Sequence, residues 1–242
     1  MNTIEVCLVP ELYQYRKTAG NNHIAVVVDI LRASTTMVVA IAQGVQKVIP
    51  VTDMNKLSEL KKNGYLIISE RDGIQSDFAD FGNSPLQLIN TDIKNAVIAI
   101  STTNGTRTLS IVNSAQKIFI GAFVNVSALC ATLRSLNQNI VIVCSGWKYQ
   151  FSLEDALFAG AVCENLTANN QFASNDDSVI ASMELWKNAK NDLLNYVSAS
   201  EHYQRLYSLG AGESVPYCFE LDICPVVPIL EEGTIMNYSP LL

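Results

Sequence analysis

The sequence predicts an α/β fold with a mixed, largely parallel sheet or sheets flanked by helices. Short runs rich in Val and Ile recur along the chain, and their nearly continuous apolar character is typical of strands covered on both faces. Segments of helical periodicity alternate with these runs. The chain has 242 residues, 49% of them hydrophobic, and no low-complexity linker, so we expect a single domain over residues 1–242.

The individual elements follow from these patterns. The expected strands are, in chain order, residues 4–9, 23–30, 47–51, 65–69, 95–101, 117–123 and 139–145. The expected helices are residues 34–44, 53–63, 104–114, 125–136 and 153–168. The tail contains Pro225 and Pro228, which predict a bend followed by a short edge strand.

One longer segment, residues 175–209, is helical in pattern throughout. Asn175 or Asp176 is expected to cap its start, and Gly210 to end it.

Two segments of the chain resemble each other, residues 25–51 and 96–122. Each consists of a strand, a Thr-Thr turn, a helix, a Gln-Lys pair and a second strand. This repeat predicts either two intertwined similar halves or a coincidence of strand–helix order. In open α/β sheets ligands bind at the carboxyl ends of strands, so the polar loops at those ends deserve the closest inspection.

Composition argues against several functions. The formal net charge is −7 and no basic cluster occurs, which argues against nucleic-acid binding. No apolar run approaches the roughly 20 residues of a membrane span, and the N-terminus lacks the pattern of a signal peptide, so we expect a cytoplasmic protein. The six cysteines form no C-x-x-C pair and only two histidines occur, which argues against zinc. The oligomeric state is left open and is compatible with a homo-oligomer.

The stretch DILRASTT, residues 29–36, places charged and hydroxyl side chains at the end of a buried run. Asp29, at the junction of strand and helix, is suited to hold a hard cation. Arg32 is suited to bind phosphate or sulfonate oxygens with its planar fork. The alternative is a local Asp–Arg pair beside a Ser/Thr helix cap.

The stretch STTNGTRTL, residues 101–109, joins a strand to a helix through a small polar turn. Backbone amides at that helix start, together with the side chains of Thr103, Asn104 and Thr106 around Gly105, predict an anion cradle. The alternative is an ordinary capped turn between strand and helix.

The stretch SLEDALFAGAV starts a helix at Ser152 and places Glu154 and Asp155 in its first turn. Adjacent carboxylates diverge on a helix, so at most one of them contacts a metal directly. The alternative is favourable acidic charge at the helix N-terminus.

The longest polar loop, residues 68–88, brings Glu70, Arg71, Asn83 and Ser84. Long loops in compact domains are often functional. The Asn-Ser pair equally fits a turn and helix start.

Two further sets of residues are weaker candidates for the site. We interpret His23 and His202 as surface residues rather than catalytic bases. Trp147 and Tyr149 either cover a site or pack.

Four stretches, DILRASTT, FGNSPL, TTNGT and SLEDALFAG, in this order resemble the 2-phosphosulfolactate phosphatase family, over residues 4–230. The resemblance implies a layered α/β fold and Mg²⁺-dependent hydrolysis of 2-phospho-3-sulfolactate to 3-sulfolactate and phosphate, on the route to coenzyme M. The site residues that it implies are Asp29, Arg32, Glu70, Asn83, Ser84, Thr103, Asn104, Gly105, Glu154 and Asp155. Where such proteins favour a small, Gly-containing loop, this chain has SGWKYQ, which leaves the substrate open.

These residues give a working hypothesis for the chemistry. Mg²⁺ is held by Asp29 together with one or both of Glu154 and Asp155, while Glu154 also counts among the catalytic residues. Glu70 orients an attacking water, or else Asp29 attacks directly and forms an aspartyl phosphate.

The substrate is a small anionic phosphate ester. It is bound by the amides and side chains around residues 103–106 and by Arg32 or Arg71. Two other functions are weighed against this one: a non-catalytic protein that binds an anionic metabolite, and a Mg²⁺ phosphatase for another small ester.

Overall fold

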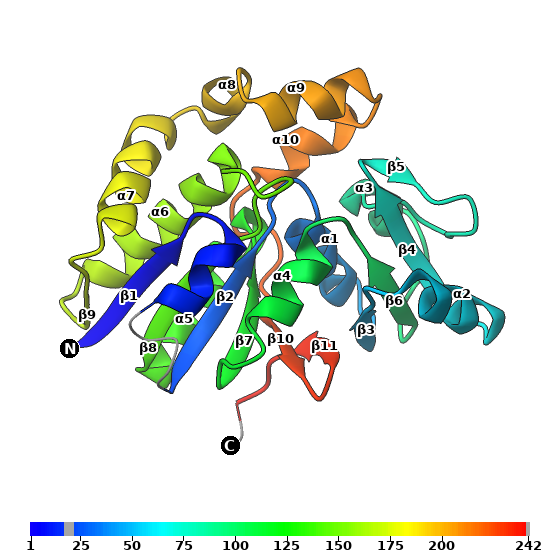
Figure 1. Ribbon diagram of the computed structural model, residues 1–242, viewed down its shortest axis with the longest axis horizontal. Coiled ribbons are helices and arrows are strands. Elements are labelled where there is room, and N and C mark those ends of the chain that lie inside the picture. Colours follow the sequence, from blue (N-terminus) through cyan, green and yellow to red (C-terminus); the bar gives the residue numbers. More distant parts are fainter. Residues whose placement is uncertain (17–21, 241–242) are drawn as a thin grey trace.

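The computed structural model describes residues 1–16 and 22–240 and confirms the α/β class. Its sheet has 11 strands in the order β5-β4-β6-β3-β11-β10-β7-β2-β8-β1-β9 (Figure 1). The strands are β1 (Asn2–Cys7), β2 (His23–Val28), β3 (Lys47–Pro50), β4 (Leu66–Arg71), β5 (Ile74–Gln75), β6 (Val97–Ser101), β7 (Lys117–Gly121), β8 (Asn139–Cys144), β9 (Phe172–Ala173), β10 (Pro228–Glu231) and β11 (Thr234–Asn237).

Helices cover the sheet and its ends. The α-helices are α1 (Ala33–Ala42), α2 (Met54–Lys62), α3 (Pro85–Ile89), α4 (Gly105–Ile111), α5 (Val126–Leu136), α6 (Leu153–Thr167), α7 (Asp177–Ala189), α8 (Leu193–Val197), α9 (Glu201–Ser208) and α10 (Val215–Cys218). The 3₁₀ helices are η1 (Pro10–Tyr15), η2 (Phe123–Asn125) and η3 (Gly212–Ser214).

The sheet consists of two parallel sets joined by an antiparallel hairpin. Strands β9, β1, β8, β2 and β7 form one set, and β3, β6 and β4 form the other. The predicted edge position of the tail strand is wrong, because β10 pairs with β7 and β11 pairs with β3, both antiparallel. The tail hairpin therefore lies in the interior of the sheet, where it takes up an open edge of each set.

The two similar segments cross between the sets in opposite directions. The unit β2-α1-β3 runs from the first set to the second, and β6-α4-β7 runs back. As a result β2 lies beside β7 and β3 lies beside β6, each pair parallel. This exchange is the intertwined arrangement that the repeat predicted as one alternative. The loops after β2 and β6, which belong to different sets, come into contact where α1 and α4 begin.

The core explains why the strands read as continuously apolar. All six residues of β2 are buried, because helices cover both faces of the sheet there. In α1 nine of the ten residues are buried, so this helix has no polar face and is enclosed between the sheet and α3. The six cysteines are buried free thiols that pack as small apolar side chains.

The segment 175–209 is not one helix, contrary to the prediction. It breaks into α7, α8 and α9, because Asp192 and Ser200 cap new helices by accepting hydrogen bonds from the amides of Asn195 and Tyr203. Asp176 caps α7, as expected. The breaks turn the chain so that α8 and α9 pass over the loops that follow the strands (Figure 1).

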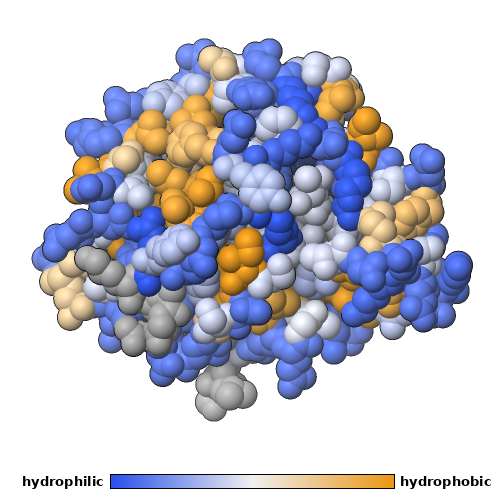
Figure 2. All heavy atoms as spheres, in the orientation of Figure 1, coloured by the Kyte–Doolittle hydropathy of each residue, from blue (hydrophilic) through white to orange (hydrophobic). Residues whose placement is uncertain are grey.

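The surface is mostly polar on the face that Figure 2 shows, with hydrophobic side chains gathered at the upper left of the view and smaller groups elsewhere on this face. No helix in residues 1–16 and 22–240 is long and apolar enough to cross a membrane.

A close contact between α6 and α7 depends on a glycine in α6. A Cβ added at Gly160 would lie 2.0 Å from the carbonyl oxygen of Ser182 and 2.8 Å from Cβ of Trp186, both in α7. Gly160→Ala is therefore expected to destabilise the protein by about 1–3 kcal/mol, because α7 must move. At an unconstrained helix position the same change would stabilise by roughly 0.5–1 kcal/mol. Urea unfolding measures the difference, and a variant at least as stable as the parent protein would contradict this packing.

Candidate active site

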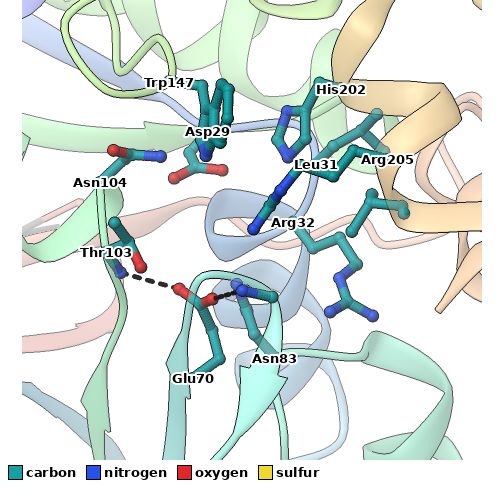
Figure 3. Close-up of a pocket in the computed structure, with 12 residues that line it drawn as sticks. Asp29, Leu31, Arg32, Glu70, Asn83, Thr103, Asn104, Trp147, His202 and Arg205 are labelled. Carbon is teal, nitrogen blue, oxygen red and sulfur yellow. Dashed lines mark hydrogen bonds between the residues drawn. The ribbon is translucent and has the colours of Figure 1, made fainter. Parts of the chain in front are cut away.

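The loops at the carboxyl ends of β2, β4, β6 and β8 meet in one small pocket (Figure 3). Its volume is about 20 Å³. The predicted site residues that line it are Asp29, Arg32, Glu70, Asn83, Thr103 and Asn104. Residues from both parallel sets therefore contribute, which follows from the exchange of strands between the sets.

Asp29 directly follows β2 and is buried, with 7% of its surface exposed. Its Oδ1 accepts a hydrogen bond from the amide of Ala33 at 3.2 Å, and its own amide donates to Oγ of Ser34 at 3.1 Å. Burial raises the pKa of the Asp29 carboxyl to about 6, with His202 opposing and Glu70 adding to the shift. No described residue donates a hydrogen bond to Oδ2, so this oxygen is available to a ligand.

The starts of α1 and α4 touch each other at Gly105. A Cβ added there would lie 2.7 Å from Cβ of Ala33 and 3.2 Å from Oδ2 of Asp29. Only glycine lets the Thr-Asn-Gly turn approach the carboxylate so closely. The predicted cradle is thus held directly beside Asp29.

Glu70 holds two loops together. Its Oε1 accepts from the amide of Thr103 at 2.8 Å and its Oε2 accepts from the amide of Gly73 at 2.6 Å. Figure 3 shows the first of these bonds crossing from the end of β4 to the cradle. Because both oxygens bind amides, Glu70 is placed to fix the shape of the pocket.

Arg32 is a buried cation whose charge is not neutralised by a bound carboxylate in the described chain. It is 6% exposed, and its Nη1 donates to Oγ of Ser214 at 3.2 Å. Within the part of the chain that the structure describes it forms no salt bridge with a carboxylate. Burial lowers its pKa, while the charges of Glu70 and Asp29 act in the opposite direction. A desolvated guanidinium of this kind gains strongly from an anionic ligand.

Three predicted binding side chains, those of Arg71, Thr106 and Ser84, do not line the pocket. Arg71 turns to the other side of β4, where its Nη1 donates to the carbonyl oxygen of Ser101 at 3.1 Å and its Nη2 to Oγ of the same residue at 2.7 Å. Thr106 is used within its own helix turn, with its amide donating to Oγ1 of Thr102 and its hydroxyl to the carbonyl of Thr102. Ser84 lines a neighbouring cavity instead.

Asp155 also acts as a clamp. Its Oδ1 accepts from the amide of Ile30 at 2.9 Å and its Oδ2 from the amide of Gly146 at 3.1 Å. Burial and the nearby charges of Glu154 and Asp29 raise the pKa of its carboxyl well above the usual range. Asp155 does not line the pocket and instead fixes the loops that follow β2 and β8.

Glu154 binds His202, which the sequence predicts to be a surface residue. Its Oε1 lies 2.7 Å from Nδ1 of His202 in α9, while its Oε2 is buried with no hydrogen-bond partner. The His202 ring stacks on Trp147 at 6.2 Å and lines the pocket, as does Arg205 one turn further along α9. The sequence held no signal for these contacts, because α9 reaches the pocket only through the breaks in the segment after α6.

The acidic groups fit one kind of metal site. The described residues include no group of three or more His, Cys, Asp and Glu side chains arranged to hold an ion. Mg²⁺, however, usually takes one or two protein carboxylates and fills its shell with water and phosphate oxygens. The unpartnered Oδ2 of Asp29 suits such an ion, and so does its burial, since a cation would offset the cost of the buried charge.

Comparison with known proteins places the chain in context. The family model described as 2-phosphosulpholactate phosphatase matches residues 7–233. A protein of Pseudothermotoga lettingae named probable 2-phosphosulfolactate phosphatase is 34% identical over 238 residues, 98% of this chain and 100% of that protein. Proteins of the same name from Caldanaerobacter subterraneus and Microcystis aeruginosa are each 36% identical, over 87% and 88% of this chain and 88% and 90% of their own lengths.

The contact between the two helix starts can be tested by moving one methyl group. Gly105→Ala is expected to lower turnover at least about tenfold, because the cradle must retreat from Asp29. The double variant Ala33→Gly, Gly105→Ala removes the closest clash and is expected to recover part of the loss. Phosphate release is the measurement. Equal activity of Gly105→Ala and the parent protein would show that the approach is unimportant.

The burial of Asp29 predicts a pH dependence of stability. The carboxyl has a pKa of about 6 in the folded protein against an ordinary 3.8, so between these values the folded state keeps a proton that the unfolded state has lost. Stability therefore falls as pH rises through this window and stays reduced above it. Asp29→Asn removes this cost and is expected to be more stable by about 2–3 kcal/mol at pH 8 and equal near pH 3.5. Urea unfolding with chelator present measures this, and a variant less stable at pH 8 would contradict it.

Proposed function

The chain belongs to the 2-phosphosulfolactate phosphatase family, and we propose that it hydrolyses 2-phospho-3-sulfolactate or a related phosphorylated hydroxy acid to the hydroxy acid and phosphate. As a member of this family it is a phosphoric monoester hydrolase. The observation that carries the proposed reaction is the convergence of Asp29, Arg32 and Asn104 on one pocket. The family resemblance alone supports the wider setting that we propose, a cytoplasmic protein on the route to coenzyme M.

The phosphate group is held by two kinds of donor. Arg32 supplies a desolvated positive charge with no carboxylate bound to it in the described chain. The amides of Thr103 and Thr106 are already used by Glu70 and Thr102. The amides of Asn104 and Gly105, at the start of α4, make no hydrogen bond with the described residues and remain for an oxyanion next to Asp29. An acidic protein thereby binds an anion through local groups.

Asp29 takes the central chemical role. Both oxygens of Glu70 bind amides, whereas Oδ2 of Asp29 is uncommitted and faces the pocket. Asp29 is therefore placed to attack phosphorus or to hold the metal, in preference to Glu70 acting as a base. A substrate chiral at phosphorus separates the two routes, since a phosphoaspartate gives retention and direct attack by water gives inversion.

Mg²⁺ is the cofactor that we propose. Asp29 would hold the ion, with water and phosphate oxygens completing the shell. When bound, Mg²⁺ supplies neutralisation of charge on the phosphoryl group. Asp155 is left out of the ligand set because both its oxygens bind backbone amides. Glu154 serves instead to orient His202 at the edge of the pocket.

The decisive test is phosphate release from a panel of phosphorylated hydroxy acids, with Mg²⁺ and with chelator. Asp29→Asn is expected to reduce kcat about 1000-fold or more while the protein stays folded. Asp177→Asn, at an exposed position at the start of α7, is the matched control and is expected to keep full activity. Mg²⁺ is also expected to raise the melting temperature of the parent protein and not that of Asp29→Asn.

Two results would contradict the proposal. Tight binding of the esters with no release of phosphate would point to a metabolite-binding protein. Full activity of Asp29→Asn would remove the assigned role of this residue.

A further inference from the structure

The residues that line the pocket around Asp29 are buried to different degrees. The inner part of the lining, which includes Asp29, Arg32 and Asn104, is buried. A second group is only half-buried, and we call these residues the mouth of the pocket: Gly73, Thr103, Trp147, His202 and Arg205. Figure 3 shows Trp147, His202 and Arg205 on the side of the pocket away from Glu70 and Asn83. With the phosphate bound inside, the carbon atoms attached to the ester oxygen lie in the mouth.

Arg205, in α9, is held in the mouth by two loops. Its guanidinium carbon lies 4.7 Å from the centre of the Trp147 ring, and its Nη2 donates to the carbonyl oxygen of Asp72. A Cβ added at Gly73 would lie 3.5 Å from Nη2 and 3.6 Å from Nη1, so the guanidinium also lies against the backbone between β4 and β5. An aromatic face and a carbonyl oxygen fix the plane of a guanidinium without neutralising its charge.

A second cation, Lys148, contacts the same ring but is not available to a ligand in the pocket. Its Nζ lies 5.0 Å from the centre of the Trp147 ring and 2.9 Å from Oδ1 of Asp72, and it does not line the pocket. Arg205 lines the pocket and, among the described residues, forms no salt bridge with a carboxylate. Arg205 is therefore the cation that the mouth offers to an anionic ligand.

Arg32 and Arg205 bring two positive charges to one pocket. Burial lowers the pKa of Arg32, and the positive charge of Arg205 acts in the same direction, although Glu70 and Asp29 oppose it. Like charges that face one pocket repel each other, and bound anions remove that cost. Arg32 is buried and is assigned to the phosphate, so Arg205 at the mouth is left for a second anionic group of the same molecule.

The proposed substrates carry such a group next to the phosphate ester. Every phosphate ester of a 2-hydroxy acid, 2-phospho-3-sulfolactate included, has a carboxylate bonded directly to the phosphorylated carbon. A carboxylate accepts two parallel N–H donors from one guanidinium. Within the described chain the hydrogen bond to Asp72 is the one that the Arg205 side chain makes, so most of its five donors remain for a ligand.

We propose that Arg205, supported by the ring of Trp147, binds the carboxylate of the substrate and thereby selects phosphate esters of 2-hydroxy acids. Arg205 is then a specificity-determining residue, and Trp147 is a positioning residue that acts through it. This inference rests on the proposed phosphatase function and adds the group that recognises the acid. It also gives a role to the bulky loop SGWKYQ.

The test compares two substrates with matched analogues. These are 2-phospho-3-sulfolactate and 2-phospholactate, each as the free acid and as the amide at carbon 1, which keeps the size and the phosphate but not the carboxylate charge. The parent protein is expected to prefer acid over amide in kcat/KM by about tenfold or more, because the amide loses a charged hydrogen-bond pair. Arg205→Gln is expected to abolish this preference. Arg205→Lys is expected to keep part of it, since the charge remains while the fork is lost.

Variants of the neighbouring loop locate the effect in the structure. Trp147→Ala is expected to lower the ratio of acid to amide, and Trp147→Phe to keep most of it, because an aromatic face still supports Arg205. Lys148→Gln is the matched control. It removes a positive charge from the same ring and from Asp72 at an exposed position outside the pocket, and it is expected to change the ratio by less than about twofold because solvent screens that charge.

Each result is a ratio of two substrates on one variant, so a general loss of folded protein cancels. If Arg205→Gln lowers kcat/KM for acid and amide equally, Arg205 does not recognise the carboxylate, although the phosphatase function stands. A parent protein without preference for the acid, or a Lys148→Gln variant that loses the preference as Arg205→Gln does, would also overturn the inference. If neither acid releases phosphate with Mg²⁺, the proposed function itself fails, and the inference falls with it.

Discussion

The pocket depends on one energetically costly feature, the buried carboxylate of Asp29 directly after β2. One backbone amide and the neighbouring His202 offset part of the cost, and the remainder appears as the raised pKa of this carboxyl. A carboxylate buried in this way gains stability when it binds a cation or a phosphoryl group. Around it the chain supplies a buried guanidinium and a helix start that glycine alone allows to come close.

The fold makes this arrangement possible by crossing two similar units through one another. Because β2-α1-β3 and β6-α4-β7 run between the parallel sets in opposite directions, α1 and α4 begin side by side. Within each set one carboxylate ties two loops together. Glu70 binds amides of the loops after β4 and β6, and Asp155 binds amides of the loops after β2 and β8. Acidic side chains in this site thus serve as often to hold the backbone as to do chemistry.

The sequence was informative where the signal is local. Apolar runs and helical periodicity predicted the strands β1, β2, β3, β4, β6, β7 and β8 and the helices α1, α2, α4, α5 and α6. The polar loops at strand ends identified Asp29, Arg32 and Asn104, which share a pocket. The location of the tail hairpin was not accessible in this way, since two prolines say nothing about which strands remain unpaired. The position of His202 in the pocket likewise depends on Glu154, which is distant in sequence. The orientation of the Arg71 side chain depends in the same way on Ser101.

The most direct test of the central claim is a crystal structure of the protein with Mn²⁺ in place of Mg²⁺ and tungstate in place of phosphate, because both are located by anomalous scattering. We predict the manganese peak at the Asp29 carboxylate and the tungstate peak between Arg32 and the start of α4. Peaks confined to other parts of the surface, with the pocket around Asp29 free of both, would contradict it.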